Sequence, residues 1–547
     1  MSLILNTPTT HCSRWDISAL RELLLANRTR DGHWEGELSS SALSTATAVS
    51  TLTLAGGNDA LVRNGLRWLD EHQNGDGGFG DADGCPSNIS TTTLAWATLS
   101  MHESVSAQRA ETWLKSQIGE LSSESLAKAI GEVYGEDQTF PVPILTHCAL
   151  AGRFRWEQIP ALPFESAAVP HSWFSWLGLP VVSYALPALI AIGQAQHYHQ
   201  PTKNLLHRQL RNATRRRTLH LLESIQPTSG GFLEATPLTS FVTMNLVGIG
   251  LVNHPVTQRG LDFLVNSVRN DGSWPIDTNL ATWVTTLSIN ALGREAFSEA
   301  ECCYLKRWLL DQQFKTTHPY TKSAPGGWAW TNCSGGVPDG DDTAGALLAL
   351  AVLGDDSEIT QAAKAGIKWL IDLQNKDGGI PTFCRGWGKL PFDRSSPDLT
   401  AHALRAWQTW NRLDPRIDRA IERAVAYLVH AQQPDGSWIP LWFGNPWTED
   451  QSNPIYGTSL VLRCGSLLPE KVRNRAKAFL YANQRSDGSF GTVEETALAV
   501  TALNDEMGMQ WLKTHDNFKA SPIGLYFAKL WYSEKLYPLI FSVAAFK

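Results

Sequence analysis

A repeated helix-and-turn unit constrains the fold of this chain more than any other feature. Each copy is a helix that ends in glutamine or a similar polar residue, followed by a turn such as Asp-Gly-Ser-Trp or Gly-Gly-Phe. Glycine supplies the positive φ of the turn, and the aromatic residue packs back onto the next helix. The turns end at Trp34, Phe79, Phe232, Trp274, Trp328, Ile380, Trp438 and Phe490, and from Phe232 onward they lie 42 to 58 residues apart. This spacing leaves room for two helices in each unit.

Segments rich in alanine, leucine and threonine lie between the turns. They have helical length and few charges, which is typical of helices buried on most of their surface. The clearest are residues 40–54, 91–99, 280–292, 343–353, 399–407 and 496–503. No convincing strand pattern is present. The sequence therefore predicts an all-α fold in which inner and outer helices close into an α/α barrel.

The composition of the chain excludes several classes of protein. A net charge of -7 gives no sign of nucleic-acid binding. The eight cysteines show no metal-ligand spacing and suit small buried residues in a reducing compartment. Residues 1–16 lack the pattern of a signal peptide, and no apolar run reaches the length of a membrane span. We therefore expect a cytoplasmic location.

Three carboxylates, Asp339, Asp341 and Asp342, lie just before the apolar segment 345–353. A proline and a glycine beside them mark a turn, so they fall at a helix N-terminus. Capping is the simplest interpretation, but it needs only one carboxylate. Repulsion and burial raise the pKa values of such a cluster, so at least one member keeps the proton that a general acid needs. A calcium loop is excluded, because alanine and leucine stand where an EF-hand has glycine and glutamate.

A second motif, Asp-x-Thr-Ala-His at 398–402, begins another apolar helix. Ser396 is expected to cap this helix, Pro397 to take its first position, and His402 to lie about one turn further in. His402 thus occupies the place on its helix that the aspartates occupy one repeat earlier. In a barrel the two helices are neighbours, so this matching register favours a functional partner over a buried core histidine.

Together, the Asp-x-Asp-Asp-Thr-Ala motif at 339–344, the motif at 398–402 and the repeats resemble squalene–hopene cyclases and other class II terpene cyclases. The resemblance spans nearly the whole chain. It implies that Asp341 protonates a terminal alkene, with Asp339 and Asp342 as electrostatic neighbours. His402 would hydrogen-bond the acid. The implied reaction is the polycyclisation of a linear isoprenoid, most of all squalene to a hopanoid-type or related triterpene, without a cofactor or a metal.

The same resemblance implies two α/α barrels with a cavity between them. Residues 31–284 would form the first barrel, and residues 1–30 with 285–547 the second, which carries the acid motif. Aromatic faces stabilise carbocations without acting as nucleophiles. Tyr456 matches a tyrosine near the acid, and the aromatic residues expected to line the cavity are Trp330, Trp283, Trp442, Tyr184, Tyr526 and Phe527. The aromatics near the C-terminus depart from the family's spacing, which leaves the product open.

Two other functions stay open at this point. One is a class II cyclase that acts on a prenyl diphosphate, with Mg²⁺ and a basic cluster handling the diphosphate. The other is a non-catalytic α/α-toroid binding module. Prenyltransferase subunits share this type of fold and hold zinc with Asp, Cys and His. This chain has Cys384 and His402 but no Asp-x-Cys pairing, which argues against that kind of subunit.

Residues 166–202 contain no charged side chain, and a basic cluster follows them. A buried core segment is one interpretation. The other is an apolar patch that rests on the inner face of an anionic membrane, with the cluster beside it. The basic residues are Lys203, Arg208, Arg211, Arg215, Arg216 and Arg217. A homodimer also stays open.

Overall fold

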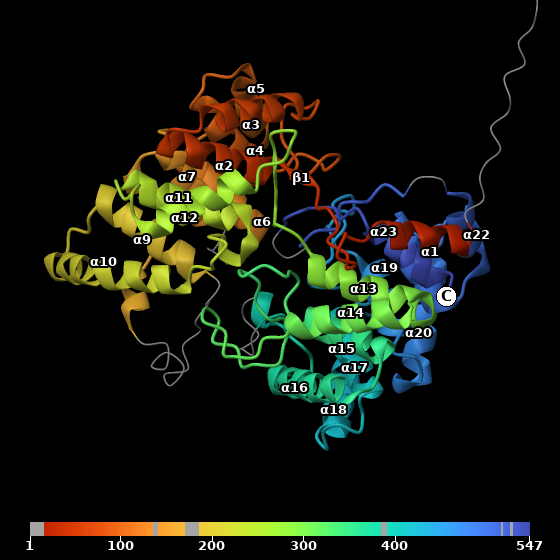
Figure 1. Cartoon of the computed structure of the whole chain (residues 1–547). Coiled ribbons are helices and arrows are strands. Elements are labelled where there is room, and N and C mark those ends of the chain that lie inside the picture. Colours follow the sequence, from red (N-terminus) through yellow and green to blue (C-terminus); the bar gives the residue numbers. More distant parts are fainter. Residues whose placement is uncertain (1–15, 135–140, 170–184, 384–390, 516–517, 526–528) are drawn as a thin grey trace, which may run out of the picture.

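The computed structural model describes residues 16–134, 141–169, 185–383, 391–515, 518–525 and 529–547. Helices joined by turns and loops make up most of this structure, which confirms the all-α prediction. The two strands, β1 (Ser40–Ser41) and β2 (Trp274–Pro275), are two residues long and pair antiparallel. Figure 1 shows the helices gathered in two groups, one running from α2 to α12 and the other from α13 to α23.

The first group is a closed ring of inner helices with further helices outside it. Each inner helix contacts the next, and the last contacts the first. The inner helices are α2 (Ala42–Ala55), α4 (Ile89–Ser100), α7 (Pro141–Leu150), α9 (Leu186–His199) and α11 (Thr236–Gly248). The others are α3 (Asp59–Glu71), α5 (Val105–Ile118), α6 (Ser123–Tyr134), α10 (Leu205–Ile225) and α12 (Pro255–Asn266), with short 3₁₀ turns η1 (Trp156–Gln158), η2 (Phe164–Ala168) and η3 (Phe232–Glu234).

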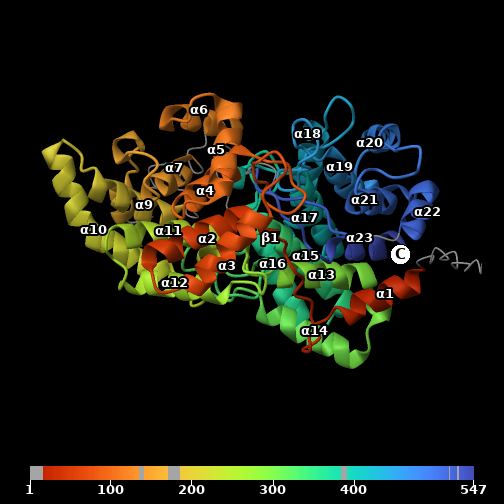
Figure 2. The same ribbon diagram turned by 90° about the horizontal axis from the view of Figure 1, so that it is seen from above.

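The second group closes in the same way. Its inner helices are α13 (Ala281–Leu292), α15 (Gly340–Leu353), α17 (Pro397–Thr409), α19 (Pro454–Leu462), α21 (Val493–Leu503) and α23 (Tyr537–Ala545). The others are α14 (Glu299–Asp311), α16 (Ser357–Leu373), α18 (Ile417–Ala431), α20 (Glu470–Ala482) and α22 (Glu506–Thr514), with 3₁₀ turns η4 (Arg294–Ala296), η5 (Pro391–Asp393) and η6 (Gly465–Leu467). Helix α1 (Ile17–Ala26) contacts α23, so the start of the described chain packs on this ring, as Figure 2 also shows.

One hydrogen bond recurs at all eight turns and sets eight of the inner helices against a turn. The backbone N–H of the residue that ends the turn donates to the hydroxyl of a threonine on an inner helix, at 2.9–3.0 Å. Trp328 donates in this way to Thr343, and Ile380 donates to Thr400. The indoles at these turns also donate to a carbonyl of the preceding outer helix, as Trp438 does to Leu428. The motif threonines therefore have a structural role.

Two of these bonds lie close to the places where the chain passes from one ring to the other. Trp34, which follows α1, donates to Thr285 of α13, and Trp274, which follows α12, donates to Thr45 of α2. Both crossings lie next to the paired strands β1 and β2. We propose that the first ring is inserted into the second. The boundary then falls before Ala281 rather than after residue 284, because α13 belongs to the second ring.

Several threonines of the inner helices satisfy their hydroxyl groups within the helix. Thr47 donates to the Leu43 carbonyl and Thr98 to the Leu94 carbonyl, four residues back in each case. Residues Ala42 to Leu52 of α2 are buried on every face, as are most residues of α15. In the described part of the chain, no helix has both the length and the hydropathy to cross a bilayer.

Candidate active site

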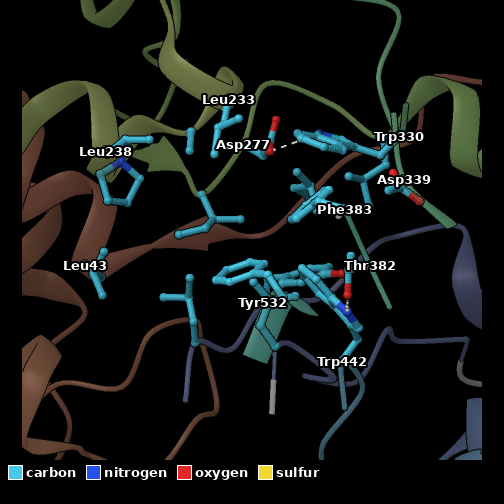
Figure 3. A pocket seen from close by; sticks show the side chains of 18 of the residues that line it. Leu43, Leu233, Leu238, Asp277, Trp330, Asp339, Thr382, Phe383, Trp442 and Tyr532 are labelled. Atoms are coloured by element: carbon cyan, nitrogen blue, oxygen red, sulfur yellow. Dashed lines mark hydrogen bonds between the residues drawn. The ribbon is translucent and has the colours of Figure 1, made fainter. Parts of the chain in front are cut away.

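A cavity of about 360 Å³ lies between the two rings (Figure 3). Its volume falls within the roughly 300–1,000 Å³ of typical small-molecule sites. Most of its lining is aliphatic or aromatic. The first ring contributes Leu43, Leu94, Ile144, Ala188 and Phe241, and the second contributes Trp283, Asp341, Asp342, Leu399 and Tyr537. Connecting segments add Leu233, Asp277, Asp339, Trp330, Phe383, Phe392, Trp442 and Tyr532, among others.

The carboxylate cluster forms the N-terminus of α15. Asp339 is the capping residue, and its Oδ1 accepts hydrogen bonds from the backbone N–H groups of Asp341 at 2.9 Å and Asp342 at 2.8 Å. The cap therefore uses one carboxylate, as the sequence suggested. Asp339 and Asp342 are buried, whereas the Asp341 side chain keeps 18% of its surface exposed. Among the three carboxylates, Asp341 therefore has the most accessible side chain at the cavity.

His402 contacts Asp341 directly. Its Nδ1 lies 2.6 Å from Asp341 Oδ1 across the interface of α15 and α17, and the histidine side chain is only 12% exposed. The expected partnership is therefore observed, but the two residues do not share a register. Asp341 is the second residue of α15, whereas His402 is the sixth of α17, and Asp398 holds the position that corresponds to Asp341. Gly345 makes room for the imidazole, because a Cβ at that position would lie 3.4 Å from His402 Cε1. His402 does not itself line the cavity.

Burial holds protons on the carboxyl groups around Asp341. It raises the pKa of Asp339 to about 7, and together with the charge of Asp339 it raises the pKa of Asp342 well above its ordinary value. Asp398 follows the same pattern, because burial and the charge of Asp341 raise its pKa to about 7. Ser396 occupies the N-cap of α17, but its hydroxyl donates to the Asp398 carboxyl and makes no capping bond. That part of the prediction was wrong, because the buried carboxyl takes the hydroxyl.

The aromatic residues expected around the cavity fall into three groups: those that line it, one that lies behind its wall, and those outside the described residues. Trp330, Trp283 and Trp442 line it. Tyr456 is buried behind the wall and lies against the lining residue Phe443, with ring centroids 4.6 Å apart. Burial and the charge of Asp341 raise the pKa of the Tyr456 hydroxyl well above its ordinary value. Tyr184, Tyr526 and Phe527 lie outside the described residues.

Sequence reasoning missed several lining residues. Asp277 follows the turn at Trp274 and resembles an ordinary turn carboxylate, yet it is buried against the cavity. Tyr532 and Tyr537 belong to the C-terminal stretch, and Tyr537 accepts a 2.9 Å hydrogen bond from the Trp283 indole. Phe383 and Phe392 also line the cavity. Within the described ranges, no group of three or more His, Cys, Asp or Glu side chains has the arrangement of a metal site.

Family models match both halves of the chain. The model of the squalene-hopene cyclase N-terminal domain matches residues 17–185, and that of the C-terminal domain matches residues 280–506. The squalene–hopene cyclase of Alicyclobacillus acidocaldarius is 25% identical over 520 residues, which covers 81% of this chain and 76% of that protein.

Two further relatives extend the comparison. A terpene cyclase–glycosyl transferase fusion protein of Humicola fuscoatra is 25% identical over 583 residues, or 84% of this chain. The alignment covers only 41% of that longer protein. The structure of ent-copalyl diphosphate synthase from Streptomyces platensis has the same fold, with a TM-score of 0.56 and 19% identity over 97% of this chain and 98% of that one.

Two helical rings around an apolar cavity with a carboxyl-rich end are the architecture of class II terpene cyclases. The two family models together match more than half of the chain. The chain therefore belongs to the squalene–hopene cyclase family of class II terpene cyclases.

The pKa of Asp398 predicts a pH dependence of stability. Its folded-state value of about 7 lies above the ordinary 3.8, so the folded protein binds more protons than the unfolded chain between these values. The contribution of this proton to the free energy of unfolding is present at pH 4 and is lost as the pH rises through 7. Asp398→Asn should remove that loss, so the variant should gain on the order of 2–4 kcal/mol relative to wild type at pH 8. Denaturant unfolding at pH 5 and pH 8 measures this difference, and parallel pH profiles for the two proteins would contradict it.

Proposed function

We propose that this protein starts the polycyclisation of a linear isoprenoid by protonating a terminal alkene, and that the isoprenoid is squalene. The observation that carries this proposal is the Asp341–His402 pair at the edge of an apolar, aromatic cavity. The product would be a hopanoid-type or related polycyclic triterpene. The squalene–hopene cyclase relatives support this choice.

Asp341 is the proposed general acid. Its O–H bond breaks as the π electrons of the alkene form a new C–H bond, which leaves a tertiary carbocation and the Asp341 carboxylate. His402 stabilises that carboxylate through their 2.6 Å contact. The burial of the neighbouring carboxyls supports the assignment, because the raised pKa values of Asp339 and Asp342 reduce the negative charge that would oppose proton release. Exclusion of water strengthens each of these interactions.

The walls suit a cation that moves through the cavity. Trp283, Trp330 and Trp442 present aromatic faces that attract positive charge without forming bonds to it. Phe383 lies beside two of them, with its ring centroid 6.1 Å from that of Trp330 and 5.7 Å from that of Trp442. These rings form a continuous aromatic surface on which successive tertiary cations would be stabilised.

The charge of the lining favours a hydrocarbon over a diphosphate. Among the described lining residues, the ionisable side chains are aspartates and tyrosines, with no lysine or arginine. A diphosphate carries about three negative charges, which need Mg²⁺ or several basic donors. A prenyl diphosphate substrate remains the second candidate, and the likeness to ent-copalyl diphosphate synthase concerns the fold alone. A non-catalytic binding module is the third candidate and leaves the Asp341–His402 contact without a role.

Metal dependence separates the first two candidates. We expect the purified protein to convert squalene to cyclised hydrocarbon or alcohol in the presence of EDTA, with no inhibition by added pyrophosphate. Farnesyl and geranylgeranyl diphosphate should give no cyclised product under the same conditions. Gas chromatography with mass spectrometry of the extracts measures the outcome. Activity confined to a diphosphate and abolished by EDTA would replace squalene with the second candidate, and no cyclisation of any of these compounds would favour the third.

We also propose that the protein touches a membrane surface, where it would meet a water-insoluble substrate. The described part of the charge-free segment does not form this contact, because α9 is an inner helix and most of it is buried. The N-terminal half of α10 is the better candidate. It exposes Leu205, Leu206 and Leu210 by 72%, 78% and 52%, next to exposed Lys203 and Arg208.

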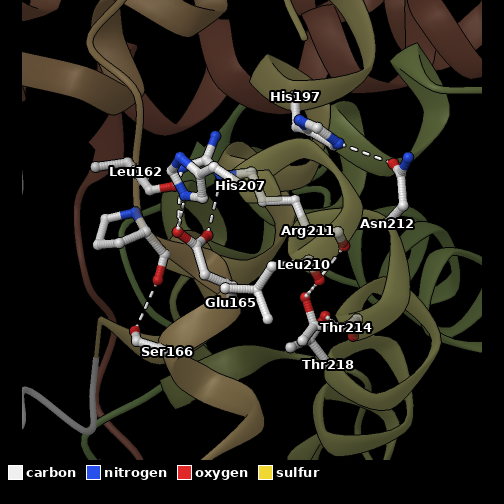
Figure 4. Close-up of polar contacts among 11 residues, drawn as sticks. Leu162, Glu165, Ser166, His197, His207, Leu210, Arg211, Asn212, Thr214 and Thr218 are labelled. Atoms are coloured by element: carbon white, nitrogen blue, oxygen red, sulfur yellow. Dashed lines mark hydrogen bonds and ion pairs between the residues drawn. The ribbon is translucent and has the colours of Figure 1, made fainter. Parts of the chain in front are cut away.

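Arg211 does not belong to this surface, although the sequence groups it with the basic cluster. It is buried, its Nε lies 3.1 Å from Glu165 Oε2, and its guanidinium lies 5.5 Å from the centre of the Phe164 ring. His207 contacts the same carboxylate at 2.6 Å (Figure 4). The cluster is therefore divided between an internal ion pair, which fixes α10 against η2, and outward-facing residues.

The membrane proposal is tested on α10. The wild-type protein should co-sediment with vesicles that contain anionic lipid, and the Leu205→Asp/Leu206→Asp double variant should bind several-fold more weakly. Both leucines are exposed, so the fold should survive, and circular dichroism checks this. The substitution Val105→Asp, at another exposed apolar residue (72%), is a matched control that should bind normally. Equal binding by all three proteins, or none by wild type, would count against the proposal.

A further inference from the structure

The three tryptophans that line the cavity share one feature. Each donates its indole N–H to a polar side chain: Trp283 to Tyr537 at 2.9 Å, Trp442 to Thr382, and Trp330 to Asp277 Oδ2 at 3.1 Å. A hydrogen bond from the N–H at one edge of an indole fixes the orientation of the ring plane. All three acceptors line the cavity, but only the acceptor of Trp330 is a carboxyl group. Figure 3 shows this bond on the side of the cavity that faces Trp442 and Tyr532.

Asp277 is held rigidly from behind. Its Oδ1 accepts a 2.7 Å hydrogen bond from the Thr278 backbone N–H, and the Thr278 hydroxyl donates to Glu234 Oε2 at 3.1 Å. Glu234 in turn accepts a 2.6 Å bond from the Gly335 N–H, five residues beyond Trp330. Three segments that are distant in sequence therefore meet around one indole: η3, the connection before α13, and the loop before α15.

The backbone around Glu234 is strained in a way that supports a specific role. Leu233 and Glu234 are consecutive non-glycine residues with φ of 57° and 55°. Such conformations cost free energy and persist where the surrounding structure fixes them. Here they place Leu233 in the cavity wall and the Glu234 carboxylate behind Asp277.

Asp277 does not need a negative charge to hold the indole. Burial, with the charge of Glu234 in addition, raises its pKa well above the ordinary value, which favours the neutral carboxyl. A neutral carboxyl still accepts a hydrogen bond through its carbonyl oxygen. An asparagine has the same shape and one acceptor oxygen, which can keep the bond from the Trp330 indole if the bond from the Thr278 N–H is given up. Leucine has neither oxygen.

We propose that Asp277 is a positioning residue that fixes the Trp330 indole against the cavity and thereby sets how far cyclisation proceeds before it ends. This inference rests on the proposed function. A ring that tilts away from the path of the cation weakens the cation–π attraction at that point, while proton transfer from Asp341 is unaffected. Intermediates then lose a proton early, and products with fewer rings accumulate.

The test compares product ratios rather than total turnover. Asp277→Leu should raise the ratio of partially to fully cyclised product by about threefold to thirtyfold, which is the range that cation–π attraction in a dry site implies. Asp277→Asn, which can keep the indole bond through its one amide oxygen, should stay much closer to the wild-type ratio than Asp277→Leu. In a Trp330→Phe background, which lacks the indole N–H, Asp277→Leu should cause no further change. The control is Asp76→Leu, which breaks a 3.0 Å bond from the Trp113 indole to a carboxylate away from the cavity and should leave the ratio unchanged.

Three results would overturn the inference. One is the wild-type ratio in a folded Asp277→Leu variant. The second is an Asp277→Asn variant that behaves like Asp277→Leu. The third is an Asp277→Leu effect of equal size in the Trp330→Phe background. If Asp277→Leu does not fold, Trp330→Phe tests the same bond from the donor side, and an unchanged ratio there overturns the inference. A wild-type protein that cyclises no isoprenoid refutes the proposed function and the inference with it.

Discussion

The hydrogen bond from the end of each turn to a threonine hydroxyl on an inner helix fixes the register of both rings. Because the bond recurs at eight turns, eight of the inner helices are held against a turn in the same way. Thr343 and Thr400 take part, and each lies close in sequence to a residue of the candidate site. The contact between Asp341 and His402 therefore follows from the architecture of the repeat.

The cavity and the carboxyl cluster depend on each other physically. Carboxyl groups placed in an apolar, water-poor space keep their protons, as the raised pKa values of Asp339 and Asp398 indicate. The same apolar space stabilises carbocations through aromatic faces and excludes the water that would quench them. Hydrogen bonds at the edges of the indoles determine which faces the cation meets. The structure thus combines a site that can donate a proton with walls that tolerate the charge this creates.

The parts of the fold that follow from local pattern could be predicted from the sequence. Repeated glycine turns and uncharged apolar helices indicated all-α rings, and two motifs on helices one repeat apart indicated that Asp341 and His402 meet. The parts set by contacts across the chain could not be predicted. Asp277 meets the Trp330 indole across 53 residues, and Tyr537 reaches Trp283 across 254 residues. Arg211 likewise has the sequence context of a surface charge, but the tertiary fold pairs it with Glu165.

The central claim is that Asp341 delivers a solvent-derived proton to the alkene that starts cyclisation, and a deuterium experiment tests it most directly. In D₂O, the wild-type protein should place one carbon-bound deuterium in each cyclised molecule. That deuterium should lie at the less substituted carbon of the initiating alkene, because the cation formed must be tertiary. Asp341→Asn should fold normally and lower turnover by at least about two to four orders of magnitude, the usual contribution of a general acid. Cyclised product without this deuterium, or an asparagine variant that works at nearly the wild-type rate, would contradict the account.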